Sequence, residues 1–171
     1  MLRGCNHAAI TTSNTTAPKG CPVKEWLNTF LSELHRAYLK PRGFRKHGRT
    51  LSLDAGTYYL RFNFQGSDSN GLYETWKFYI NTGVEFKDLE PETYWHTFAH
   101  THWAVRIKYV VAEAPDAWRY TLNTDRNALA AELVGLIDKT TANVAGDAGR
   151  IRNRYLAKKD AQSARFNQQA D

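Results

Sequence analysis

Apolar side chains recur every three or four positions near the start of the sequence, the spacing of one face of an α-helix. Pro22 suits the first turn of a helix. Pro41 disfavours helical backbone at the residue before it, and Gly43 suits the turn that follows. We therefore predict an amphipathic helix over about residues 22–40, with its apolar face packed on the rest of the protein. That face consists of Val23, Trp26, Leu27, Phe30, Leu31, Leu34 and Tyr38.

The pattern then changes to an alternation of apolar and polar residues, which is typical of half-buried β-strands. Residues 58–65 alternate in this way, and residues 73–84 do so around Trp76, Phe78 and Ile80. A short strand is also predicted over residues 50–53, with a tight turn before residue 58. Because short connections join these segments, we predict an antiparallel meander.

Beyond residue 85 the alternation is weaker. Residues 104–111 alternate again and predict a fourth strand. Residues 118–122 fit either a short strand or the lead-in to the last helix.

The last predicted helix begins after Thr124 or Asp125, because both side chains can cap a helix N-terminus. Gly146 and Gly149 predict a break in it, and residues 151–166 form a basic, weakly amphipathic segment. The apolar face of this last helix carries Leu129, Leu133, Leu136 and Ile137.

Together these segments predict an α+β fold: an N-terminal amphipathic helix packed on an antiparallel sheet of about four or five strands, with a C-terminal helix. We place a single domain at residues 22–150. Residues 1–21 are expected to be a disordered tail, and residues 151–171 a basic C-terminal helix or tail.

Composition fits one domain with a substantial core, since 42% of the 171 residues are hydrophobic and 13% are aromatic. The formal net charge of +6 permits an acidic partner, although a modest excess is also common in proteins that bind none. Cys5 and Cys21 precede the predicted fold, so neither a core disulfide nor a cysteine-based zinc site is expected. No stretch resembles a transmembrane helix or a signal peptide, and we expect a cytoplasmic protein without a membrane partner.

Several short motifs follow one another along the chain. Gly-Phe-Arg-Lys-x-Gly-Arg-Thr spans 43–50, Phe-Asn-Phe-Gln-Gly-Ser spans 62–67, and Phe-x-Ile-Asn-x-Gly-Val spans 78–84. Trp-x-x-Arg-Ile, Asp-x-Trp and Asn-Thr-Asp follow from positions 103, 116 and 123. In this order, residues 23–150 resemble the DUF4304 family of bacterial proteins. The resemblance implies a fold type and a bacterial origin. The family's function is unknown, so it implies no catalytic residues.

Basic side chains gather directly after the first helix, in what we interpret as a turn. Arg42, Arg45, Lys46, His47 and Arg49 lie close together, with glycines among them. Guanidinium groups and free backbone N–H groups can hold a phosphate or a carboxylate. The alternative is a solvated turn whose cations pair with nearby carboxylates.

The polar positions of the two long strands form a second candidate site. If these strands pair, their outward side chains meet in one patch beside the basic turn. The alternative is the ordinary solvent-facing side of an antiparallel sheet. Asparagine and glutamine are unfavourable or neutral in strands, and such exceptions are more frequent at functional places. The patch consists of Arg61, Asn63, Gln65, Lys77, Tyr79 and Asn81.

His96, His100 and His102 are a third candidate and depart from the family pattern. His96 and His100 would share one helical face, and three imidazoles can hold zinc with an open fourth position. The alternative is that they pack as ordinary side chains. The sequence contains no nucleophile elbow, Walker loop or dinucleotide fingerprint. An acidic cluster over residues 85–92 and the basic residues of 150–165 are each interpreted first as solvated charge.

We therefore predict a non-enzymatic binding domain, immunity-like or accessory, that docks a protein partner through the polar sheet positions and Arg45, Lys46 and Arg49. No cofactor is expected under this interpretation. A nucleic-acid-binding module is the first alternative. A metal-dependent hydrolase with zinc on His96, His100 and His102 is the second. The sequence indicates no oligomeric state.

Overall fold

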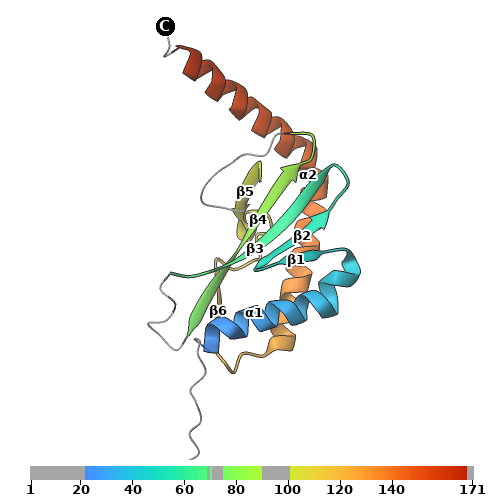
Figure 1. Ribbon diagram of the computed structural model, residues 1–171, viewed down its shortest axis with the longest axis vertical. Coiled ribbons are helices and arrows are strands. Elements are labelled where there is room, and N and C mark those ends of the chain that lie inside the picture. The colour runs from blue at the N-terminus through green and yellow to red at the C-terminus, as the bar shows by residue number, and fades with distance from the viewer. Residues whose placement is uncertain (1–21, 69, 71–74, 90–100, 169–171) are drawn as a thin grey trace, which may run out of the picture.

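The computed structural model describes residues 22–68, 70, 75–89 and 101–168 (Figure 1). In these ranges two helices pack on one face of a sheet, and short helical turns connect some of the elements. In chain order the elements are α1 (Pro22–Leu34), a π-helical turn (His35–Leu39), a 3-10 turn (Lys40–Arg42), β1 (Arg45–His47), β2 (Thr50–Asp54), β3 (Tyr58–Gly66), β4 (Trp76–Phe86), β5 (Trp103–Arg106), a second 3-10 turn (Ile107–Tyr109), β6 (Trp118–Tyr120) and α2 (Arg126–Gln168).

The sheet is antiparallel and has six strands, in the order β1-β2-β3-β4-β5, with β6 also paired to β4. β6 pairs with the start of β4, where Phe78 lies opposite Trp118, and β5 pairs with its second half, where Asn81 lies opposite Arg106. The predicted α+β class and antiparallel meander are confirmed. The additional strand is β1, which was predicted to be a turn, and residues 118–120 form a strand.

The core lies on one face of the sheet, where both helices pack. Alternate residues of β3 are buried, as the alternation predicted, and Leu60 and Phe62 are 0% exposed. They join one hydrophobic cluster with Leu27 of α1 and with Leu133 and Ile137 of α2. Because strand side chains alternate in direction, the polar positions of β3 and β4 face away from both helices.

The end of the first helix differs from the prediction. Its apolar face is buried from Trp26 to Leu34, but Tyr38 is 40% exposed and Leu39 is fully buried instead. The Lys40 N–H donates to the His35 carbonyl, which is the five-residue step of a π-helix. The wider turn moves the buried position on by one residue. Gly43 then closes the segment at φ +87°, a left-handed conformation that favours glycine.

The predicted strand over residues 104–111 is wrong beyond Arg106. The chain turns there into the 3-10 turn, and the N–H groups of Val110 and Val111 both donate to the Ile107 carbonyl. This turn buries Ile107 and Val111 together, whereas a strand would also have buried Tyr109. Tyr109 is instead 72% exposed.

α2 is continuous, so the predicted break at Gly146 and Gly149 is wrong. The Asp125 side chain caps its first turn, with Oδ1 accepting from Asn127 N–H at 2.9 Å. The apolar face runs from Val144, before both glycines, to Ile151 and Tyr155 beyond them, and burial of these side chains offsets the glycine cost. Figure 1 shows the C-terminal part of α2 extending past the end of the sheet. Among the described residues, no helix is long and apolar enough to cross a bilayer.

Alanine in place of Gly135, Gly146 or Gly149 is expected to raise the free energy of unfolding by about 0.5–1 kcal/mol each. All three lie inside α2, and an added Cβ would meet nothing within 4 Å. Urea denaturation followed by circular dichroism would measure the change. A lower unfolding midpoint in these variants would contradict a continuous helix at these positions.

Candidate binding surface on the sheet

The strand register places the predicted polar side chains on one surface. Asn63 lies opposite Asn81, and Gln65 lies opposite Tyr79, so the expected pairing of the two long strands is confirmed. Arg106 of β5 joins the same surface, because it pairs with Asn81. We call this surface the polar sheet face. It comprises Thr50, Ser52, Arg61, Asn63, Gln65, Lys77, Tyr79, Asn81 and Arg106.

Side chains in the middle of the polar sheet face hold one another in place. The Asn81 amide nitrogen donates to Gln65 Oε1 at 3.1 Å, and the Arg106 guanidinium lies 3.5 Å from the same oxygen. Arg106 also covers the Tyr79 ring, with 4.2 Å from guanidinium carbon to ring centroid. On β2, Thr50 Oγ1 accepts a hydrogen bond from Asn63 at 3.0 Å. The amides and the guanidinium are therefore held in set positions, which lowers the conformational entropy lost on binding a partner.

Arg61 differs from Arg106 in being neutralised. It is ion-paired with Glu85, and the two side chains are 25% and 17% exposed. Its Nε is buried and has no hydrogen-bond partner among the described residues. Arg106 forms no ion pair with a described carboxylate, so its charge remains available to an anion. Arg106 was missing from the predicted patch, because sequence alone did not give the register that places it beside Asn81.

A hollow of about 470 Å³ adjoins Arg106 at the end of the polar sheet face. Gln65, Tyr79 and Arg106 line it, together with Asp68 and Asp116. The Asp116 carboxylate is ion-paired with Lys108. The hydrogen bond from Lys108 holds the pKa of Asp116 below its usual range, and nearby Arg106 lowers it further by a smaller amount. The same hydrogen bond raises the pKa of Lys108. The hollow therefore contains the Arg106 guanidinium, which forms no ion pair with a described carboxylate, together with the paired Asp116 and with Asp68, which forms no ion pair with a described residue.

The residues predicted as a basic turn are divided by strand alternation. His47 pairs with Thr50, which leaves Gly48 and Arg49 as a two-residue loop, with Gly48 at φ +54°. Arg45 lies on the same side as Ser52 and Arg61, and Lys46 lies on the opposite side because it pairs with Leu51.

Arg49 also lies away from the polar sheet face. Its Nε donates to Asn28 Oδ1 of α1 at 2.8 Å. The predicted cluster of Arg45, Lys46 and Arg49 is therefore not brought together on one surface. β1 was hard to predict, because Arg45, Lys46 and His47 show no apolar alternation.

Gly83 lies on the same side of β4 as Asn81, where the chain passes close to it. An added Cβ would lie 2.7 Å from Thr101 Cγ2 and 3.3 Å from the Trp103 carbonyl oxygen. A strand glycine of this kind marks a close approach of backbone.

We expect Gly83→Ala to lower the free energy of unfolding by about 1–3 kcal/mol, because the methyl group must displace its neighbours. Urea denaturation would measure it. Gly135→Ala is the matched control, because the same substitution is expected to raise the free energy of unfolding there. A higher free energy of unfolding in both variants would contradict the close packing at Gly83.

Of the three predicted zinc ligands, His96 and His100 lie outside the described residues. The His102 ring is 7% exposed and packs against Phe86 and Tyr155. Its Nδ1 accepts a hydrogen bond from the Phe86 N–H at 2.9 Å, so that nitrogen is occupied within the fold. No group of three suitable ligands occurs in the described part of the chain. Zinc binding stays a prediction, and elemental analysis of protein purified without chelator would test it.

Some residues of the other charged segments form ion pairs. Asp88 of the predicted acidic cluster pairs with Arg152, whose hydrogen bond holds the pKa of Asp88 below its usual range. Arg150 pairs with Asp147 within α2. Exposed pairs of this kind contribute little stability.

A family model described as a domain of unknown function, DUF4304, matches residues 35–147. The chain therefore belongs to the DUF4304 family, as the motifs predicted. No curated protein and no solved structure matches the chain.

Proposed function

We propose that this protein is a non-enzymatic binding domain that docks an acidic surface of another protein on its polar sheet face. One observation carries the proposal: Arg106 stacks on Tyr79 and contacts Gln65, which Asn81 also holds, and no described carboxylate neutralises the guanidinium. A stacked guanidinium beside fixed amides suits recognition of carboxylates and backbone groups. Arginine and tyrosine are also the residue types that most often dominate interface energies.

The charge on this face supports an acidic partner. Carboxylates on or beside it are largely paired with cations, in Asp54–Lys87, Glu85–Arg61 and Asp116–Lys108. Asp68 at the margin forms no ion pair with a described residue. Cations on the same side without a described carboxylate partner are Arg45, Lys77, Arg106 and Arg119. This excess would attract an acidic surface and speed association at low salt.

Within this class we favour an immunity-like or accessory role, in which the domain neutralises another protein. This finer role rests on the type of protein, a small domain whose candidate surface is suited to docking. The neighbouring genes provide a direct check. A toxin gene beside this one would support the role, and a consistent absence of any such neighbour would argue against it.

Affinity capture with matched baits would test the proposal. The wild-type protein, Arg106→Glu and Arg36→Glu would be used on extract of the cells that express it. Arg36 is an exposed arginine in the π-helical turn after α1, so its reversal changes the net charge equally. We expect a partner to be captured by wild type and Arg36→Glu and lost with Arg106→Glu. A purified partner that binds all three equally would overturn the proposal.

Single-stranded nucleic acid is a second candidate, because Tyr59 and Tyr79 lie among arginines on an open sheet. Bases stack on exposed aromatic faces. Arg106 already covers one face of Tyr79, so a base would have to displace it, and this favours a protein partner. Fluorescence anisotropy with labelled random single-stranded DNA and RNA at low salt would separate the two. No binding at low salt would exclude nucleic acid.

A further inference from the structure

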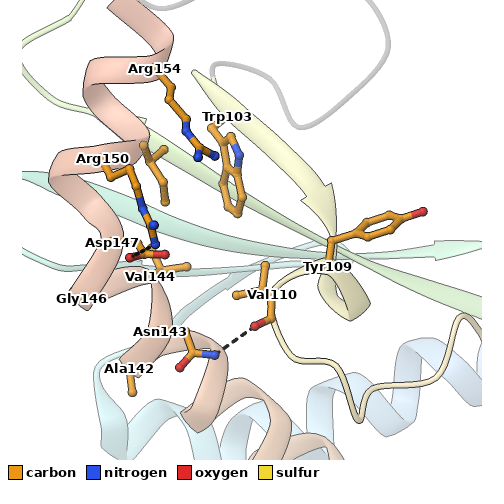
Figure 2. Close-up of a pocket in the computed structure, with 11 residues that line it drawn as sticks. Trp103, Tyr109, Val110, Ala142, Asn143, Val144, Gly146, Asp147, Arg150 and Arg154 are labelled. Atoms are coloured by element: carbon orange, nitrogen blue, oxygen red, sulfur yellow. Dashed lines mark hydrogen bonds and ion pairs between the residues drawn. The ribbon is translucent and has the colours of Figure 1, made fainter.

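A second concave site lies on α2, away from the polar sheet face. It is a groove of about 530 Å³ between α2 and residues 103–110 (Figure 2). This volume is within the range of small-molecule sites. Val144 and Ile151 line it from α2, and Val110 and Trp103 line it from the other side. Trp103 pairs with Val84, which is buried on the core-facing side of β4, so the groove and the polar sheet face use opposite sides of the sheet.

The two arginines at this groove have different surroundings. Arg150 is ion-paired with Asp147, as the dashed line in Figure 2 shows. Arg154 extends from α2 toward the Trp103 indole, whereas Tyr109 points away from the groove. Arg154 forms no hydrogen bond or ion pair with any described residue. The groove therefore presents a guanidinium that no described residue pairs, at the same opening as a partly exposed indole.

Gly146 provides space in the wall of the groove. It lines the groove from inside α2, where glycine is less favourable than alanine. An added Cβ would meet nothing within 4 Å, so packing does not require glycine at this position. A larger side chain at position 146 would reduce the space.

We propose that this groove binds a small planar anion, an aromatic ring that carries a carboxylate or a phosphate. The Arg154 guanidinium would hold the anionic group, because its planar fork matches carboxylate and phosphate oxygens. The Trp103 indole would stack on the ring. Val144 and Ile151 would supply the apolar floor. This site is independent of the proposed protein docking surface.

Titrations followed by NMR would test the site, with the Trp103 indole N–H as reporter, assigned from Trp103→Phe. The probes are 2-naphthoate for an aromatic carboxylate, adenosine monophosphate for a nucleotide, and inorganic phosphate as the ring-free control. We expect saturable shifts with 2-naphthoate, adenosine monophosphate or both, and none with phosphate. A single responsive probe identifies the source of the anion. Arg154→Gln should weaken binding about tenfold or more, since it removes a charged hydrogen-bond donor.

Gly146→Leu is the blocking variant, because leucine occupies the space and favours the helix, so the fold is expected to be kept. Gly135→Leu is its matched control, since Gly135 is an exposed glycine of α2 outside the groove. We expect Gly146→Leu to abolish the shift and Gly135→Leu to leave it unchanged. No saturable shift with either aromatic probe at millimolar concentration would overturn the proposal. A shift that survives both Gly146→Leu and Arg154→Gln would overturn it as well.

Discussion

Replacement of Phe78 with alanine is expected to lower the free energy of unfolding by about 3–5 kcal/mol. Phe78 is 0% exposed and lies where β4 meets β6. Its ring stacks on Trp118 at 5.5 Å between centroids and meets Tyr120 edge-on at 5.7 Å. Tyr120 in turn stacks on Trp26 of α1 at 4.9 Å. Loss of the ring would leave a cavity in a row of aromatic side chains that joins the sheet to the first helix.

Urea denaturation followed by far-ultraviolet circular dichroism would measure this loss. Tyr109→Ala is the matched control, because this aromatic residue is 72% exposed, and its loss is expected to change the free energy by less than about 0.5 kcal/mol. Equal effects of the two substitutions would contradict the central position of Phe78. The expected loss is a large fraction of the total free energy of unfolding of a single domain.

Arg106→Gln is expected to weaken binding of the protein partner by roughly 10- to 100-fold, the effect of removing a charged hydrogen-bond donor. Glutamine provides neither the charge nor the planar guanidinium that covers Tyr79. Arg106→Lys keeps the charge but loses the planar guanidinium, so its affinity for the partner should fall between those of wild type and Arg106→Gln.

Isothermal titration with the purified partner would give the dissociation constants. Arg36→Gln removes the same charge from an exposed position in the π-helical turn, which contacts β1 at the other edge of the sheet from β5, and should change the affinity by less than about twofold. Circular dichroism of each variant would show that the fold is intact. If Arg106→Gln and Arg36→Gln bind alike, Arg106 is not an anchor of the interface.

The sequence predicted the layers of this fold because burial leaves a strong period. Alternation in β3 separated Phe62 and Phe64 from Asn63 and Gln65, and the structure places them on opposite faces. The errors lie where hydrogen bonding changes the period or where burial outweighs a local helix-breaking signal. The π-helical turn buries Leu39 in the place predicted for Tyr38. α2 continues past Gly146 because apolar residues beyond it are buried.

The candidate site was less predictable than the fold, because it depends on register between strands distant in sequence. Gln65, Tyr79 and Asn81 could be assigned to one side from alternation alone. Arg106 joins them through pairing across β4 and β5, which local sequence does not encode. Alternation in β1 also separates Lys46 from Arg45, and this required knowing that the basic segment is a strand.

The most direct test of the docking surface is the footprint of the bound partner. Side-chain amide signals of Asn63, Gln65 and Asn81 can be followed by NMR in labelled protein, with the unlabelled partner added. We expect these three signals to shift or broaden on binding, and those of Asn28 on α1 and Asn143 on α2 to stay in place. Changes confined to Asn28 or Asn143, with the three sheet amides unmoved, would contradict docking on the polar sheet face.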